Sequence, residues 1–417
     1  MLSKSNVKLD ILFIFLLPIV GCISFFKSGN ITKYASPFFF FLVFFGVFFV
    51  VPTSGDAYRH YQEFRDFSFI DFNEFWDEFI KILNFKSMTE SDIYAYSSKF
   101  ILSRISDSPS LFFGFHAFTF ALVYVSTLKL VLKNVNVHKT ILTTFFFLLI
   151  VFVAPISKIQ YVRYYFAGWL FIYGALKILK TKNYKNYVFI ILSILVHFSF
   201  LVPAILFIGY FFLRKRIYVW MIIAVFAFTS NSFLSQFTSS ISTFTQTNFG
   251  ESQLQGKTAA YTENEEYIEQ RRQRFEERAW YANPAKYLRW AYNVILLTLI
   301  SLILLKKIKL NKNLLNLFTF SLFLFSIGQL GNAFASLGER LEQIFFIVFS
   351  VFCLHYFYNN KNKLLNNIAY TCTPLYSIFL VMSIREIFSV GDLFIFIGNP
   401  LFAFLADRIS ILSLISG

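Results

Sequence analysis

The chain has 417 residues, of which 57% are hydrophobic and 15% charged, and it carries 38 Lys and Arg against 23 Asp and Glu. In a soluble protein this basic excess would suggest a nucleic-acid partner. Here the basic residues are spread over short loops between long apolar segments, so we expect no such partner. The apolar segments approach the length that a helix needs to cross a bilayer. The composition predicts an all-α, polytopic integral membrane protein and excludes a β-barrel, whose strands would be shorter and alternating.

The apolar segments predict about 11–13 membrane segments in a single domain, 1–417. Residues 187–213 are too short for two ordinary spans, yet basic loops flank both ends, so we expect two short helices or a re-entrant pair broken near 197–203. The tail, 393–417, is either a span or an interfacial segment. The other candidate spans are 9–26, 35–52, 109–128, 140–157, 164–180, 217–234, 287–305, 313–331, 341–358 and 365–384.

Charge is sorted between two sets of loops. Six short loops hold 18 of the 38 Lys and Arg residues and none of the 23 Asp and Glu residues. The positive-inside rule predicts that these loops face the cytoplasm. The two long polar stretches, 53–108 and 235–286, then share the outer face, and most arginines go with them. Because guanidinium binds phosphate or carboxylate in a bidentate manner, this bias suggests anion recognition outside. The six loops are 27–33, 129–139, 177–187, 214–216, 306–312 and 359–363.

Both long outer loops are expected to contain helices. Asp71 and Glu74 form an acidic variant of a capping box, and a stripe of apolar residues over 72–83 follows them, which predicts an amphipathic helix on the outer leaflet. In the second loop, Thr262 and Glu265 form a regular capping box before a densely charged helix. That helix is either solvated, with internal ion pairs, or functional.

Several polar residues stand at the outer ends of spans. Arg163 and Arg340 each open a span, where a single arginine can simply extend to the interface, although its guanidinium also suits pyrophosphate. His197 interrupts an apolar run; it is either a packing residue or a functional one. Asp56 leaves the second span and is followed by Tyr58 and Tyr61; an acid with aromatic rings is typical of sugar binding, although a capped loop helix explains the pattern as well.

These residues resemble a known pattern. Arg163 followed by Ala167, an apolar span, the basic loop 180–185 and the His197–Ser199 tract are similar to the core of the EpsG/Wzy family of polysaccharide polymerases. The early Asp56…Tyr61 motif, with Tyr58 inside it, matches an Asp-x-x-x-Tyr pattern in the same family. The resemblance is specific over about residues 50–205 and topological beyond.

The resemblance implies a GT-C-like helical bundle in the bacterial inner (plasma) membrane that polymerises O-antigen or capsule repeat units. Its substrates would be glycans on undecaprenyl pyrophosphate, joined at the outer face, and a chain-length-regulator protein is a possible partner. A base and cations on the leaving group are then needed. We expect Asp56 or His197 as the base and Tyr58 and Tyr61 at the glycan. The expected pyrophosphate ligands are Arg163, Arg340, Arg278 and Arg289.

No cofactor or metal is expected, since arginine can supply the charge. Two other functions remain open. A lipid-linked oligosaccharide flippase would also have many spans, but typically internal repeats and short loops. An O-antigen ligase would share the lipid donor and the outer arginines.

Overall fold

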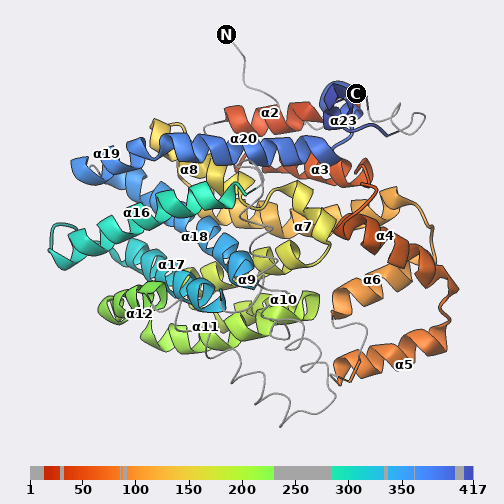
Figure 1. The fold of residues 1–417 in the computed structure, drawn as a ribbon, viewed down its shortest axis with the longest axis horizontal. Coiled ribbons are helices and arrows are strands. Elements are labelled where there is room, and N and C mark those ends of the chain that lie inside the picture. Colours follow the sequence, from red (N-terminus) through yellow and green to blue (C-terminus); the bar gives the residue numbers. More distant parts are fainter. Residues whose placement is uncertain are drawn as a thin grey trace.

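The computed structural model describes residues 14–28, 32–84, 86–87, 92–229, 283–332, 337–360, 362–399 and 408–416. All named elements in this part of the chain are helices (Figure 1). The chain-order list is α2 (Ile19–Lys27), α3 (Ala35–Val47), α4 (Asp56–Asp66), η1 (Phe67–Phe69), α5 (Phe72–Leu83), α6 (Ile93–Ser103), α7 (Pro109–Leu132), α8 (Ile141–Phe152), η2 (Ile156–Tyr161), α9 (Tyr164–Thr181), η3 (Tyr184–Asn186), α10 (Tyr187–Val196), η4 (Phe198–Phe200), α11 (Leu201–Leu213), α12 (Ile217–Thr229), α16 (Ala285–Leu304), α17 (Lys312–Gly331), α18 (Leu337–Asn359), α19 (Lys363–Thr371), α20 (Thr373–Val390), α21 (Leu393–Ile397) and α23 (Ile411–Ser416).

Six stretches of the described chain are helical, long and apolar enough to cross a membrane, which confirms the all-α membrane class. They are 109–132, 141–161, 285–304, 312–331, 338–359 and 373–390. Four shorter apolar helices accompany them, at 35–47, 184–196, 198–213 and 217–229. The predicted span at 164–180 is a helix, α9, but its lysines and tyrosines make it less apolar than the six.

Three predicted spans have different limits in the structure. In the first, residues 14–16 are helical, the helix is interrupted at 17–18, and the nine residues of α2 follow; residues 9–13 lie outside the described part. The span predicted at 365–384 is divided at Cys372, because α19 ends there and Pro374 starts α20, which runs on to Val390. The tail contains only the short helices α21 and α23 among its described residues.

The predicted break in 187–213 is confirmed. α10 ends at Val196, His197 has extended backbone angles, and a short 3₁₀ turn leads into α11. The two helices contact each other and α10 packs closely on α9, so this non-helical backbone lies against protein.

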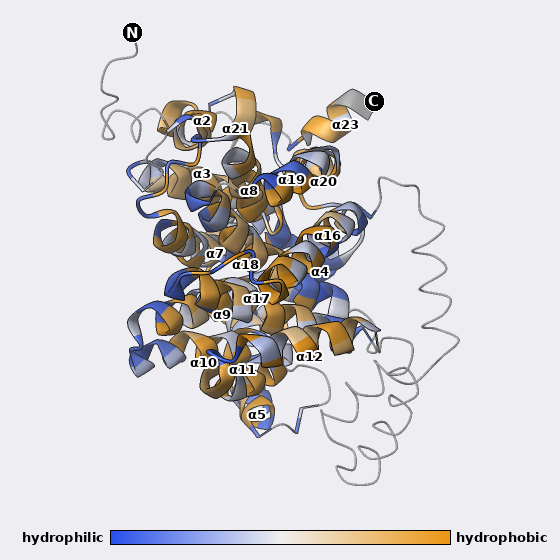
Figure 2. Ribbon diagram, turned by 90° about the vertical axis from the view of Figure 1, so that its left-hand side faces the viewer, coloured by the Kyte–Doolittle hydropathy of each residue, from blue (hydrophilic) through white to orange (hydrophobic). Residues whose placement is uncertain are grey.

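Long helices pack side by side in the bundle and α4, α5 and α6 gather at one end of it, on the right of Figure 1, whereas α19 lies at the left. The closest pairs are α17 with α18, α3 with α7, and α9 with α10, and α8 also packs on α18. Figure 2 shows that the helices are mainly hydrophobic and that hydrophilic residues gather in the connecting loops.

Local capping explains where several of these helices begin. The Asp71 carboxylate accepts a hydrogen bond from the Glu74 amide, as expected for α5. Ser108 caps α7, whose first residue is Pro109. Thr140 and Thr143 form a reciprocal capping box on α8. The helix predicted after Thr262 lies outside the described residues, as does nearly all of the loop 235–286.

Candidate functional site

A polar cavity of about 390 Å³ lies at the end of the bundle where α9, α16 and α18 begin. We call it the arginine-lined cavity. Side chains of α4, of η2 and of the α10–α11 break complete its wall. Five of the residues predicted from the sequence to act in the site line it together, although they are far apart in the chain: Asp56, Arg163, His197, Arg289 and Arg340.

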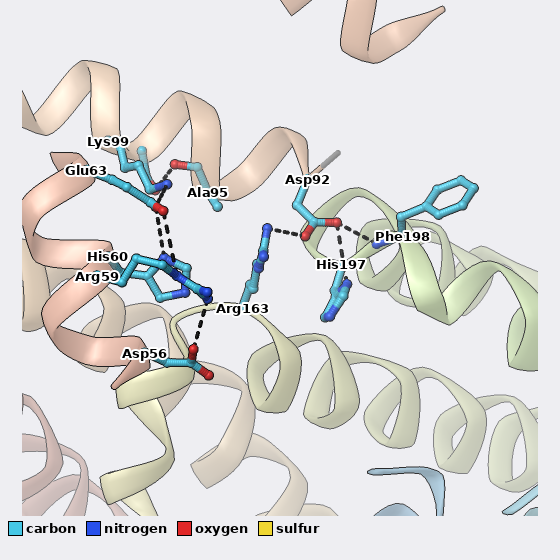
Figure 3. Close-up of polar contacts among 11 residues, drawn as sticks. Asp56, Arg59, His60, Glu63, Asp92, Ala95, Lys99, Arg163, His197 and Phe198 are labelled. Atoms are coloured by element: carbon cyan, nitrogen blue, oxygen red, sulfur yellow. Dashed lines mark hydrogen bonds and ion pairs between the residues drawn. The ribbon is translucent and has the colours of Figure 1, made fainter. Parts of the chain in front are cut away.

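Asp92 joins two of these residues (Figure 3). Its carboxylate, only 1% exposed, lies 2.5 Å from Nη1 of Arg163 and 3.4 Å from Nδ1 of His197. The backbone amide of Phe198 donates to the same carboxylate at 2.8 Å. One buried acid therefore orients the guanidinium of Arg163 and fixes the backbone and ring of the α10–α11 break.

The backbone before Arg163 is strained. Val162, a β-branched residue, has φ +55° and ψ −48°, in a region that such residues rarely occupy. A conformation of this kind costs on the order of 1–3 kcal/mol and is found mainly where a site requires it. It turns the chain sharply between η2 and α9, so that Arg163 becomes the N-cap residue of α9 at the cavity wall.

A second carboxylate–histidine pair stands on α4. Nδ1 of His60 lies 3.2 Å from Glu63, and Nζ of the buried Lys99 lies 2.5 Å from the same carboxylate. Burial opposes ionisation of Glu63, but its hydrogen bond with His60 and the charge of Lys99 lower its pKa to about 2. Burial lowers the pKa of His60 below its usual 6.5, so the ring that lines the cavity is neutral at pH 7.

Asp56 has a different environment from the two histidines. Its carboxylate accepts a hydrogen bond from Nη2 of Arg59 at 2.9 Å, and both side chains are more than a third exposed. Asp56 is thus a solvent-accessible acid in an ion pair at the start of α4, whereas His60 and His197 are buried.

Two further cations at the cavity wall are held by carboxylates. Arg289 contacts Glu342 in a bidentate manner, with both N–O distances 2.5 Å, and Glu342 is only 3% exposed. Lys158 contacts Glu386 at 2.7 Å. Both cations line the cavity and are held by an acid; Glu342 also lines the cavity, whereas Glu386 does not.

Arg340 is different, because no described carboxylate forms an ion pair with it. Its guanidinium lies over the ring of Tyr164, 5.2 Å from the centroid. Among the described residues that line the cavity, it is the arginine whose charge is not already paired. An anion that enters the cavity is therefore expected to interact more strongly with Arg340 than with the arginines that are already paired.

The remaining predicted residues are not in this cavity. Tyr58 is 41% exposed, and the Tyr61 hydroxyl donates to the backbone oxygen of Asp107 at 3.3 Å; neither tyrosine lines the wall. Their predicted role at the glycan stays a prediction. Arg278 lies outside the described residues.

Sequence reasoning missed Asp92, Glu342 and the His60–Glu63–Lys99 group. Asp92 precedes α6 and looks in the sequence like an ordinary helix cap. The i, i+3 spacing of His60 and Glu63 on a short helix was a usable signal. In the described part of the chain, no group of three or more His, Cys, Asp or Glu residues could hold a metal ion.

Comparison with known proteins agrees with the motif resemblance. The sequence model of the EpsG family matches residues 33–391, well beyond the segment 50–205 that carries the motifs. No curated protein and no solved structure matches the chain.

Proposed function

Since the chain belongs to the EpsG family, we propose that it is a membrane glycosyltransferase that polymerises oligosaccharide repeat units carried on undecaprenyl pyrophosphate. The reaction would take place at the outer face of a bacterial inner membrane and would build O-antigen or capsular polysaccharide. One observation carries this proposal: the arginine-lined cavity is lined by the ion-paired Asp56, by two histidines that each have a carboxylate within 3.4 Å of Nδ1, and by several cations. Such a set matches the two needs of glycosyl transfer from a pyrophosphate, a base and leaving-group stabilisation.

The proposed reaction transfers the growing glycan to the acceptor. A hydroxyl oxygen of the lipid-linked acceptor attacks the anomeric carbon of the donor glycan. The bond from this carbon to the pyrophosphate oxygen breaks, and undecaprenyl pyrophosphate leaves with the bonding electrons. The hydroxyl proton passes to a base on the protein. No oxidant or reductant is needed.

The leaving pyrophosphate is assigned to Arg340 and Arg163. Arg340 has no carboxylate partner among the described residues, so its fork is available for two phosphate oxygens. Arg163 has one nitrogen on Asp92, which orients the remaining donors. Arg289 would assist electrostatically, since Glu342 already holds two of its nitrogens.

For the base, the geometry favours His197 over Asp56. The Asp92 carboxylate at Nδ1 of His197 would orient the ring and leave Nε2 for a substrate proton. One carboxylate oxygen of Asp56 is already occupied by the hydrogen bond from Arg59, and the side chain is more than a third exposed. His60, held by Glu63 in the same way, is the alternative that the structure adds.

A deletion strain tests the function. Surface glycan with one repeat unit is expected, because single units are still exported and ligated. Loss of every repeat would point to a flippase or a ligase and contradict a polymerase. Complementation with the wild-type gene should restore long chains, whereas an Arg340→Ala variant at the same protein level should not.

A further inference from the structure

A second cavity, of about 250 Å³, lies at the opposite ends of α9 and α18, two of the helices that line the arginine-lined cavity. It is bounded by the last turns of α7, α9 and α18 and by the first turn of α17, at the end of the bundle that carries basic loops 129–139, 177–187, 306–312 and 359–363. Its polar lining consists of Lys133, Lys180, His355 and the amides Asn311, Asn313, Asn316 and Asn359. We call it the lysine-lined cavity.

No acidic side chain compensates the charge of this cavity. Lys133 and Lys180 form no ion pair with a described residue, and no Asp or Glu is among the residues that line the cavity. A lysine near a helix C-terminus is favourable by itself, which accounts for each residue separately. This effect at the helix ends does not explain why both lysines line one cavity that no acidic side chain lines.

The rest of the lining also suits an anion. The side-chain oxygen of Asn311 accepts the capping hydrogen bond from the Leu314 amide, so its NH₂ group remains as a donor. α17 starts at the cavity, which adds the positive end of its helix dipole. His355 is not one of the donors available to an anion, because its Nε2 is already hydrogen-bonded to the carbonyl oxygen of Val131.

The position of the cavity indicates where its ligand comes from. Leucine and valine side chains of the helices form the apolar remainder of the wall. Residues 164 and 180 of α9, which line the two cavities, are separated by about 24 Å along the helix. Since the hydrocarbon core is about 30 Å thick, cavities at both ends of α9 fall near the two headgroup levels.

We propose that the lysine-lined cavity binds the phosphate group of an anionic phospholipid headgroup, with the apolar wall against the first carbons of the lipid. Basic pockets between membrane helices recognise such headgroups through a few lysines, each contributing about fivefold in affinity. The site is separate from the arginine-lined cavity and does not depend on the polymerase reaction.

Lipid titration followed by native mass spectrometry tests the proposal on the full chain in detergent. Phosphatidylglycerol should bind at least tenfold more tightly than phosphatidylcholine, which has the same phosphate but no net charge. The Lys133→Gln/Lys180→Gln variant should lose about 25-fold in phosphatidylglycerol affinity. The matched control is Lys182→Gln/Lys185→Gln, which removes the same charge from exposed residues at the same end that do not line the cavity; it should keep wild-type affinity.

A second variant keeps the proposal testable if the double variant folds poorly. Asn313→Asp places a negative charge at the exposed rim of the cavity and should weaken phosphatidylglycerol binding by about fivefold. Equal affinity in wild type and in both cavity variants would overturn the site. Inorganic phosphate is the second probe. If phosphate binds and phosphatidylglycerol does not, and the lysine variant abolishes phosphate binding, the phosphate chemistry is supported and the lipid source is overturned.

Discussion

The two cavities at opposite ends of α9 and α18 hold cations in different ways. In the arginine-lined cavity, Arg163 and Arg289 are each fixed by a buried carboxylate, and Lys158 is held by Glu386. In the lysine-lined cavity, Lys133 and Lys180 have no acid beside them. A guanidinium fixed on a carboxylate keeps its remaining donors in one orientation, whereas a lysine on a flexible stem supplies charge without direction.

This difference distinguishes a site that catalyses group transfer from a site that only binds an anion. A transferring group needs donors that are already in place when charge develops, because reorganisation during the reaction would cost much of the gain. A headgroup that only has to stay bound does not need that order. The carboxylates of the arginine-lined cavity therefore act as supports for the cations, at the expense of part of their positive charge.

The largest expected effect concerns membrane topology, because a cysteine is labelled either from one side of the membrane or from the other. If the two cavities face opposite sides of the membrane, single cysteines at Asn73 of α5 and at Lys182 should react with a membrane-impermeable thiol reagent from opposite sides, in a background without the three native cysteines. A cysteine at Gln270 should react from the same side as Asn73, since the sequence predicts that the loops 53–108 and 235–286 both lie outside. Labelling of position 270 from the cytoplasmic side alone would contradict both the topology and the proposed site.

Next in size is the loss of a phosphate ligand. Arg340→Ala or Arg163→Ala should lower polymerisation at least 100-fold, because a donor to developing charge is removed. Arg340→Lys should keep part of the activity, since the charge remains but the fork is lost. The comparison is the glycan ladder of each variant at matched protein level, with Lys182→Gln as control. Full activity of both alanine variants would remove these arginines from the mechanism.

Asp92→Asn comes third. It leaves the guanidinium of Arg163 without its buried acid and should destabilise the fold by about 3 kcal/mol. The loss of orientation at Arg163 and His197 should also reduce the activity of the folded fraction at least tenfold. Thermal unfolding of the detergent-solubilised protein and the ladder per folded molecule separate the two effects. Asp107→Asn, an exposed acid outside the cavity lining, is the control.

These residues also show what the sequence could and could not predict. Arg163, Arg340 and His197 were identifiable because a polar residue in or beside an apolar run is rare and carries a cost. The break at His197 followed from length and charge alone. Asp92 could not be found in this way, because an acid before a helix has an ordinary local explanation and its contacts are with residues 71 and 105 positions away in the chain.

The limits of the helices were predictable to differing degrees. α7, α16, α17 and α18 are bounded by charges and caps that are visible in the sequence. The division between α19 and α20 was not foreseen, since an apolar run continues across Cys372 and only Pro374 marks the new start. Both cavities are formed by tertiary packing between helix ends, which hydropathy does not encode.

Replacing the base should have a moderate effect on polymerisation, and the size of this effect depends on which residue is replaced. If His197 accepts the acceptor proton, His197→Gln should lose long chains while lipid-linked donor still copurifies with the protein. Asp56→Ala should then retain more activity than His197→Gln. If His60→Gln is the inactive variant and His197→Gln polymerises normally, His197 is a packing residue and the base belongs to α4. The measurement is the glycan ladder together with the amount of bound lipid-linked donor.

The smallest effect is a pH dependence at the supports. The folded pKa of Glu63 is about 2, below its ordinary value of 4.5, so the carboxylate stabilises the fold above pH 4.5 and loses this contribution as the pH falls towards 2. The difference in Tm between wild type and Glu63→Gln should therefore be greatest above pH 4.5 and should shrink in that window. Because Glu63 is about a third exposed, the change is modest. A difference for Glu63→Gln that stays constant across that window would show that Lys99 and His60 do not depend on this acid.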